Sequence, residues 1–106
     1  MAEWIDVIAA TEMPDGSRRL VRKAGHEIAL FCIQGNFYAI EDSCPHQGAS
    51  LANGKLDGTT VACRAHGLRF DLATGCQRGQ TGLRTRIFPV RLHEDRIQID
   101  LAPPSA

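Results

Sequence analysis

The chain lacks a long hydrophobic segment and an excess of charge of either sign. No run of about eighteen apolar residues occurs, so no stretch predicts a membrane-spanning helix. The 12 Lys and Arg residues balance the 12 Asp and Glu residues, which argues against a polybasic surface for nucleic acid or membranes. The N-terminal residues MAEWID include two acidic ones, Glu3 and Asp6, where a secretory signal needs a basic start and an apolar run. We therefore expect a soluble, cytoplasmic protein.

The length and the cysteine content limit the architecture further. With 106 residues, 43% of them hydrophobic and 23% charged, the sequence predicts one globular domain spanning residues 1–106. A domain of this size buries a modest core, so an additional stabilising element would help it to fold. The 4 cysteines of a cytoplasmic chain are more often metal ligands or buried thiols than disulfide partners.

Short strands separated by turns dominate the sequence, and no stretch has convincing helical periodicity. The apolar run within residues 27–34 is typical of a buried strand, and Gly35-Asn36 after it predicts a two-residue hairpin turn. His26 and His93 fall at turns, where we expect them to face solvent. Strands are expected at residues 3–9, 18–23, 27–34, 37–41, 86–92 and 96–101, followed by a disordered tail at about 102–106.

The segment of about residues 43–75 has a different texture. Glycines interrupt it repeatedly, and its predicted strands, residues 60–62 and 69–71, are too short to bury a core of their own. Such a segment needs another source of stability. Two cysteine- and histidine-containing motifs within it supply candidate ligands.

These motifs are Cys44-Pro45-His46 and Cys63-Arg64-Ala65-His66. Two thiolates and two imidazoles are able to hold a tetrahedral zinc ion. Zinc motifs, however, usually pair cysteine with cysteine and histidine with histidine. The mixed halves favour a two-iron site in which cysteines bind one iron and histidines the other.

Both motifs, with Arg69-Phe70-Asp71, Thr74-Gly75 and Phe88-Pro89-Val90, resemble the small bacterial Rieske ferredoxins. The resemblance implies an all-β Rieske fold: an antiparallel β-sandwich-like base with a small inserted cluster-binding subdomain at about residues 43–75. It also implies one 2Fe–2S cluster bound by Cys44, His46, Cys63 and His66, with both histidines close to solvent.

By the same resemblance, the protein is a one-electron carrier and not an enzyme. It would be a monomer that passes electrons from an NAD(P)H-dependent flavoprotein reductase to a terminal oxygenase, such as an aromatic-ring-hydroxylating dioxygenase in aromatic hydrocarbon catabolism. One alternative is a small subunit of an assimilatory nitrite reductase, which would co-purify with the large enzyme. Another is a structural zinc module that mediates protein contacts, which would be colourless.

The resemblance also predicts a reduction potential at the low end of the Rieske range. High-potential relatives have a disulfide where this chain has Ala49 and Ala65, and hydroxyl donors where it has Leu68 and Phe70. Fewer hydrogen bonds to the cluster sulfurs leave the reduced form less stabilised.

Arginine is concentrated in residues 60–91, which hold six arginines and one acidic residue, Asp71. A scattered, solvated surface is the simpler interpretation. The alternative is a basic rim, with Arg64 and Arg69 docking an acidic patch of a redox partner. Of the remaining cysteines, we expect Cys32 to be a buried apolar residue and Cys76 to be a more exposed free thiol.

Overall fold

The computed structural model describes residues 3–42, 51–52, 54–63, 69–76 and 85–102. In these ranges the chain forms strands and one short 3-10 turn, η1 (Ala10–Glu12), and every strand pairing is antiparallel. The strands are β1 (Trp4–Ala9), β2 (Arg18–Lys23), β3 (His26–Ile33), β4 (Asn36–Glu41), β5 (Lys55–Asp57), β6 (Thr60–Ala62), β7 (Arg69–Asp71), β8 (Ile87–Phe88), β9 (Val90–His93) and β10 (Arg96–Asp100). The prediction of an all-β, antiparallel fold is confirmed.

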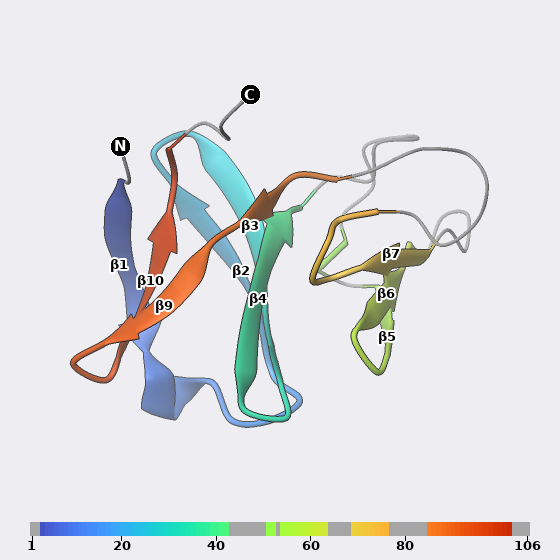
Figure 1. Ribbon diagram of the computed structural model, residues 1–106, viewed down its shortest axis with the longest axis horizontal. Coiled ribbons are helices and arrows are strands. Elements are labelled where there is room, and N and C mark those ends of the chain that lie inside the picture. The colour runs from blue at the N-terminus through green and yellow to red at the C-terminus, as the bar shows by residue number, and fades with distance from the viewer. Residues whose placement is uncertain (1–2, 43–50, 53, 64–68, 77–84, 103–106) are drawn as a thin grey trace.

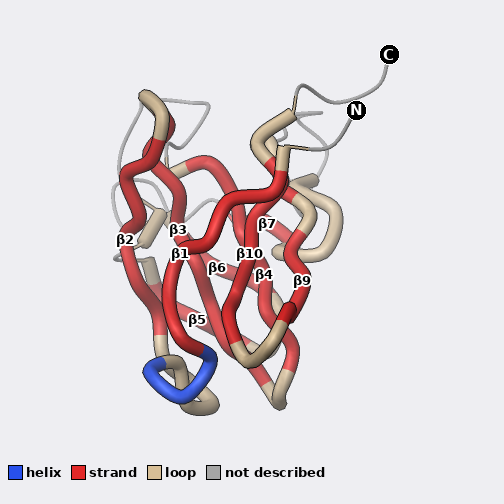
Figure 2. Tube along the Cα trace, turned by 90° about the vertical axis from the view of Figure 1, so that its left-hand side faces the viewer, coloured by secondary structure: helices blue, strands red, loops and turns tan. Residues whose placement is uncertain are grey.

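The strands form three sheets. The sheets β1-β10-β9 and β2-β3-β4-β8 make the base, and β5-β6-β7 forms a smaller sheet beside it (Figure 1). In the view turned by 90° about the vertical axis, the strands of the base sheets run roughly from top to bottom (Figure 2). The small sheet lies within the segment of about residues 43–75 that the sequence singled out.

Strand β3 is buried on both faces and joins the two hydrophobic cores. Ile28 and Leu30 point into a cluster between the two base sheets, whereas Ala29 and Phe31 point into a second cluster. All four are 0% exposed. This explains why β3 is a continuous apolar run and not an alternating one.

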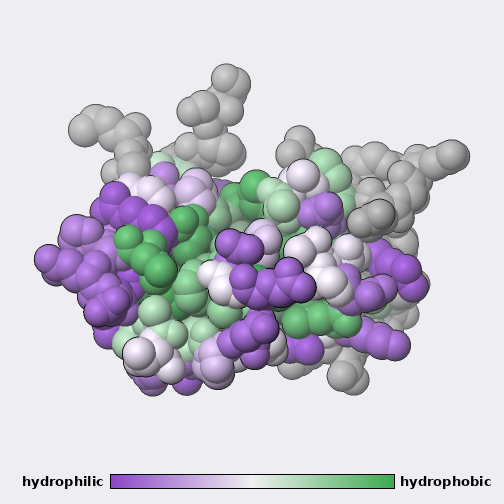
Figure 3. All heavy atoms as spheres, turned by 60° about the horizontal axis from the view of Figure 1, so that its bottom comes forward, coloured by the Kyte–Doolittle hydropathy of each residue, from purple (hydrophilic) through white to green (hydrophobic). Residues whose placement is uncertain are grey.

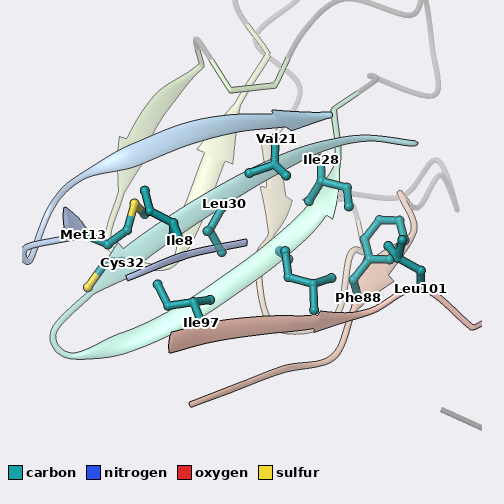
Figure 4. Close-up of a cluster of buried hydrophobic side chains, with 11 residues drawn as sticks. Ile8, Met13, Val21, Ile28, Leu30, Cys32, Phe88, Ile97 and Leu101 are labelled. Atoms are coloured by element: carbon teal, nitrogen blue, oxygen red, sulfur yellow. The ribbon is translucent and has the colours of Figure 1, made fainter. Parts of the chain in front are cut away.

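The first cluster fills the space between the base sheets (Figure 4). Met13 and Cys32 lie at one end of it, and Phe88 and Leu101 lie at the other. The second cluster joins Phe31 and Ile40 of the base to Leu51, Val61, Cys63, Phe70 and Leu72, so it attaches the small sheet to the base. Full burial of each large apolar side chain contributes about 1.5–3 kcal/mol.

The expected strand at 86–92 is divided at Pro89 into two strands that belong to different sheets. Strand β8 pairs with β4, whereas β9 pairs with β10. Proline donates no backbone N–H, so it suits a point where the chain leaves one ladder for another. The Pro89 carbonyl still accepts a hydrogen bond from the Asp100 amide at 3.0 Å.

Two local predictions were wrong. The hairpin turn is Gln34-Gly35, with φ of 52° and 80°, because Ile33 and Asn36 already form the last strand pair. Two positive φ angles are what a type I′ hairpin turn requires. His26 is half-buried at the start of β3, with its ring edge-on to Phe88 at 5.8 Å between centroids. His93 is exposed, as expected.

The surface seen in Figure 3 mixes hydrophilic residues with small hydrophobic areas. Among the described residues, the large hydrophobic side chains that are exposed are Leu20, Ile87 and Leu92, at 44%, 37% and 56%. The part of the chain that the structure describes contains no helix with the length and apolar character needed to cross a membrane. The predicted tail falls, apart from Ala102, outside the described residues.

Candidate metal centre

Cys63 is the predicted ligand that the structure describes. It directly follows β6, and its side chain is 1% exposed within the second cluster. Residues two apart on a strand share a face, so Cys63 continues the buried face that Val61 occupies. The thiol is therefore directed away from bulk water at the end of a strand. A buried thiol fixed at the end of a strand is a suitable metal ligand.

The other predicted ligands, Cys44, His46 and His66, lie outside the described residues, and so does Arg64. Ala49, Ala65 and Leu68, on which the potential depends, lie there too. Within the described residues no group of three potential metal ligands occurs. What the structure provides is the geometry of the flanks of the two predicted ligand loops.

These flanks meet. Leu51 and Ala52 follow the first ligand segment, and Gly54 lies against the strand that leads to Cys63. A Cβ placed on Gly54 would lie 2.4 Å from the Ala62 carbonyl oxygen and 2.7 Å from Val61 Cγ2. The glycine thus permits an approach that any side chain would prevent. The exit of the first ligand segment and the entry to the second are in direct contact.

Residues of the base hold this exit through hydrogen bonds to the backbone. Asp42 Oδ1 accepts from the Ala52 amide at 2.6 Å, and Asp42 is 6% exposed. The Arg18 guanidinium donates from Nη1 to the Ala52 carbonyl at 3.2 Å and also to the Gly54 carbonyl. Sequence reasoning missed both residues. No sequence signal indicates such contacts, because their partners are backbone groups distant along the chain.

The segment after β7 is tied back to the base. The Gly75 amide donates to the Asp71 carbonyl at 2.7 Å, and the Thr85 amide donates to the Gly75 carbonyl at 2.8 Å. The Asp71 amide donates to the Cys76 carbonyl at 2.9 Å. Phe70, between these contacts and the second ligand segment, is 0% exposed in the second cluster. The small sheet is therefore connected to β8 through Thr85.

On the solvent face of the small sheet, positive and negative side chains lie at opposite ends. Lys55, Ala62 and Arg69 are cross-strand neighbours on β5, β6 and β7, and both cations are exposed. Asp57 and Asp71 occupy the opposite end of the same face. This face is hollowed by a cavity of about 260 Å³ to which Lys55 and Arg69 contribute. The cationic end adjoins Cys63 and the start of the second ligand segment, and sequence reasoning had not included Lys55.

The remaining described cysteines, Cys32 and Cys76, differ in burial. Cys32 is 3% exposed in the first cluster, on the opposite face of the base sheet from Cys63. Burial raises the pKa of the Cys32 thiol; a backbone hydrogen bond with Gly35 opposes this shift and the Asp15 carboxylate adds to it. Cys76 is exposed. Both placements confirm the expectations, and Cys32, Cys63 and Cys76 are free thiols.

Comparison with known proteins relates this arrangement to a family. The model of the Rieske 2Fe-2S domain matches residues 3–89. The ferredoxin component of the naphthalene 1,2-dioxygenase system of Pseudomonas aeruginosa is 35% identical over 103 residues, which cover 94% of this chain and 97% of the relative. The ferredoxin component of the alkene monooxygenase system of Xanthobacter autotrophicus is 31% identical, with coverage of 95% and 84%.

A solved structure shows the same fold. A chain in the complex of reduced oxygenase and oxidised ferredoxin of carbazole 1,9a-dioxygenase is 33% identical, with a TM-score of 0.84. The match covers 92% of this chain and 92% of that chain.

Proposed function

Because the chain belongs to the Rieske 2Fe–2S domain family, we propose that it carries single electrons from an NAD(P)H-dependent flavoprotein reductase to the terminal oxygenase of a multicomponent system. The chain is a ferredoxin, an electron-transfer component and not the catalytic enzyme of such a system. The proposal rests on the extent of one match, which spans 94% of this chain and 97% of a ferredoxin component of similar length.

The cofactor of the family is one Rieske-type 2Fe–2S cluster. Bound by two thiolates and two neutral imidazoles, such a cluster takes up one electron at a higher potential than an all-cysteine cluster does, about −150 to +300 mV against about −400 mV. The ligands that we assign are Cys44, His46, Cys63 and His66. The burial of Cys63 and the contact between the flanks of both ligand segments support this assignment.

Single cysteine variants test the ligand set, because the chain provides its own controls. We expect Cys63→Ser to lose the visible absorption of the cluster and its two irons per chain. Cys76→Ser and Cys32→Ala should retain both, since Cys76 is exposed and Cys32 lies in the other core. Loss of the cluster in Cys76→Ser, with retention in Cys63→Ser, would overturn the assignment.

The segment of about residues 43–75 is then the cluster-binding subdomain, and its solvent face is the proposed docking surface. We assign the docking of an acidic patch on the redox partner to Arg64 and Arg69, and we add Lys55. Lys55 and Arg69 are exposed on one row of the small sheet, at the end nearest Cys63. Cations close to the cluster would steer the partner to the point where transfer distances are short.

Charge reversal tests the docking surface. We expect the double variant Lys55→Glu/Arg69→Glu to slow reduction of the oxygenase about tenfold at low ionic strength, and the effect should shrink at high salt. Lys23→Glu, a single reversal on the β2–β3 hairpin, should have little effect. Stopped-flow measurements at two salt concentrations decide the matter, with the visible spectrum as a check on the cluster. Unchanged rates in the double variant would refute the docking assignment.

We further propose that the protein is a cytoplasmic monomer whose partners exchange, and that the oxygenase acts on aromatic hydrocarbons. The relatives support the oxygenase as partner, because they are named as components of oxygenase systems. They lend no support to a fixed nitrite reductase subunit or to a zinc module. Affinity capture from the native host tests the proposal: an oxygenase and a flavoprotein reductase should be recovered, and a large sirohaem reductase in equal amount would contradict it.

A further inference from the structure

We propose that Arg18 and Asp42 are positioning residues, which set the geometry of the cluster by holding Ala52 from both sides. We call this contact the Ala52 clamp, made of Arg18, Asp42 and Ala52. The proposal rests on the ligand set assigned above, because the clamp acts on the segment between the two ligand motifs. It concerns residues outside both motifs.

Asp42 closes the first ligand segment at its base. Its carboxylate bonds the Ala52 amide at 2.6 Å, across the segment that contains Cys44 and His46. The Asp42 amide donates to the Glu27 carbonyl of β3 at 2.9 Å, so the residue is itself fixed to the base. A hydrogen bond from an amide to a buried carboxylate is among the stronger ones in proteins. The two ends of the ligand segment are therefore kept at a defined separation.

Arg18 holds the same residue from the other side. It lies on β2 opposite Phe31, and therefore on the face of the base sheet that carries the second cluster. Its guanidinium donates to the carbonyls of Ala52 and Gly54, which lie 34 and 36 residues later in the chain. The amide of Ala52 thus meets a carboxylate, and its carbonyl meets a guanidinium. Each charge stabilises one end of the residue, and neither contact depends on the Ala52 side chain.

The clamp transmits this constraint to the second ligand segment through Gly54. The close approach of Gly54 to Val61 and Ala62 leaves no space for a side chain. Leu51 and Val61 are both 0% exposed in the second cluster. Cys63 follows two residues after Val61. A shift of the backbone at Ala52 and Gly54 would therefore displace the strand that ends before Cys63, because packed interiors do not absorb such shifts without strain.

The experiment compares holoprotein variants. Arg18→Met keeps the apolar stem and removes the donors, and Asp42→Asn keeps an acceptor and removes the charge. Arg18→Lys restores a cation. Arg19→Met is the matched control: Arg19 is the next residue of β2, and its ion pair is an exposed one with Glu12 at 3.9 Å. The readouts are the visible circular dichroism of the cluster, the paramagnetic resonance spectrum after reduction, the rate of cluster loss, and hydrogen exchange of peptides covering Ala52.

We expect Arg18→Met and Asp42→Asn to change both spectra, to raise the rate of cluster loss about tenfold, and to increase exchange at Ala52. Arg18→Lys should restore most of each property, and Arg19→Met should match the wild type. The double variant should lose less than the two single variants combined, because both hold one residue.

Two results would overturn the proposal. One is a set of variants that lose thermal stability while both cluster spectra stay as in the wild type, which would make the contacts merely structural. The other is equal behaviour of Arg18→Met and Arg19→Met. If Arg18→Met fails to fold, Asp42→Asn and Arg18→Lys decide the matter by the same spectra. A wild-type protein without a Rieske signal would instead refute the proposed function.

Discussion

Gly75 offers a direct test of how tightly the turn after β7 packs against the segment leading to β8. Its φ is +77°, and an added Cβ would lie 2.2 Å from the Thr85 carbonyl oxygen and 3.0 Å from Ile87 Cγ2. The Thr85 amide also donates to the Gly75 carbonyl at 2.8 Å. Because the obstructing atom belongs to a hydrogen-bonded backbone, it has little freedom to move away.

Gly35 is the matched control. Its φ is +80°, and an added Cβ would meet nothing within 4 Å. Placing an L-residue in the left-handed region costs roughly 1–2 kcal/mol, and forcing atoms into a packed site costs about 1–3 kcal/mol more. Gly35→Ala should therefore destabilise the protein by about 1–2 kcal/mol and Gly75→Ala by about 2–5 kcal/mol.

Thermal unfolding of the holoproteins at one scan rate measures the difference, because cluster loss makes unfolding irreversible. In a domain of this size, 1 kcal/mol corresponds to about 4–8 °C in Tm. The apparent Tm of Gly35→Ala should fall by about 4–16 °C, and that of Gly75→Ala about twice as far. Equal falls would refute the close contact between Gly75 and Thr85.

Three further variants or measurements test the stability of the fold and the potential of the cluster. Backbone hydrogen bonds from Glu3 and Ala102 lower the pKa of Asp100, so its charge stabilises the fold above about pH 4 and this contribution is lost as the pH falls through the lowered pKa. Asp100→Asn should thus lower the apparent Tm at pH 7, with a gap to the wild type that narrows below about pH 4; a gap independent of pH would contradict the cause. Phe70→Ala should destabilise the protein by about 3–5 kcal/mol because Phe70 is 0% exposed, whereas Leu92→Ala, at a 56% exposed position, should cost about 0.5 kcal/mol or less; similar losses of Tm would refute the second core. Voltammetry should place the reduction potential in the lower half of about −150 to +300 mV, and a value in the upper half would contradict the hydrogen-bond argument.

Most strands and the ligand motifs were predictable from sequence because each depends on local pattern, whereas β5 was not expected. Alternation in β10 and the apolar run of β3 identify strands, and the mixed cysteine and histidine motifs identify a Rieske-type site. The Gln34-Gly35 turn was misplaced by one residue, since Gly35-Asn36 is equally acceptable to local turn rules. The division of the expected strand at Pro89 was not predictable from local pattern, because it depends on β8 pairing with β4 and β9 pairing with β10.

The contacts of Arg18 and Asp42 were beyond prediction for a different reason. Both side chains bind backbone groups of Ala52, and a backbone group has the same chemistry in every residue. Arg18 reads in sequence as one of several exposed cations on a polar strand. Only the packing of the small sheet on the face of Phe31 brings Ala52 within its reach.

The central claim is that this chain binds a 2Fe–2S cluster through two cysteines and two histidines. Electron–nuclear double resonance on the reduced protein tests it most directly, with histidine labelled by ¹⁵N. We expect couplings from two histidine nitrogens that change with the label, at two irons per chain. A signal without any histidine nitrogen coupling would contradict it, because the chain has 4 cysteines and an all-thiolate cluster would give that result.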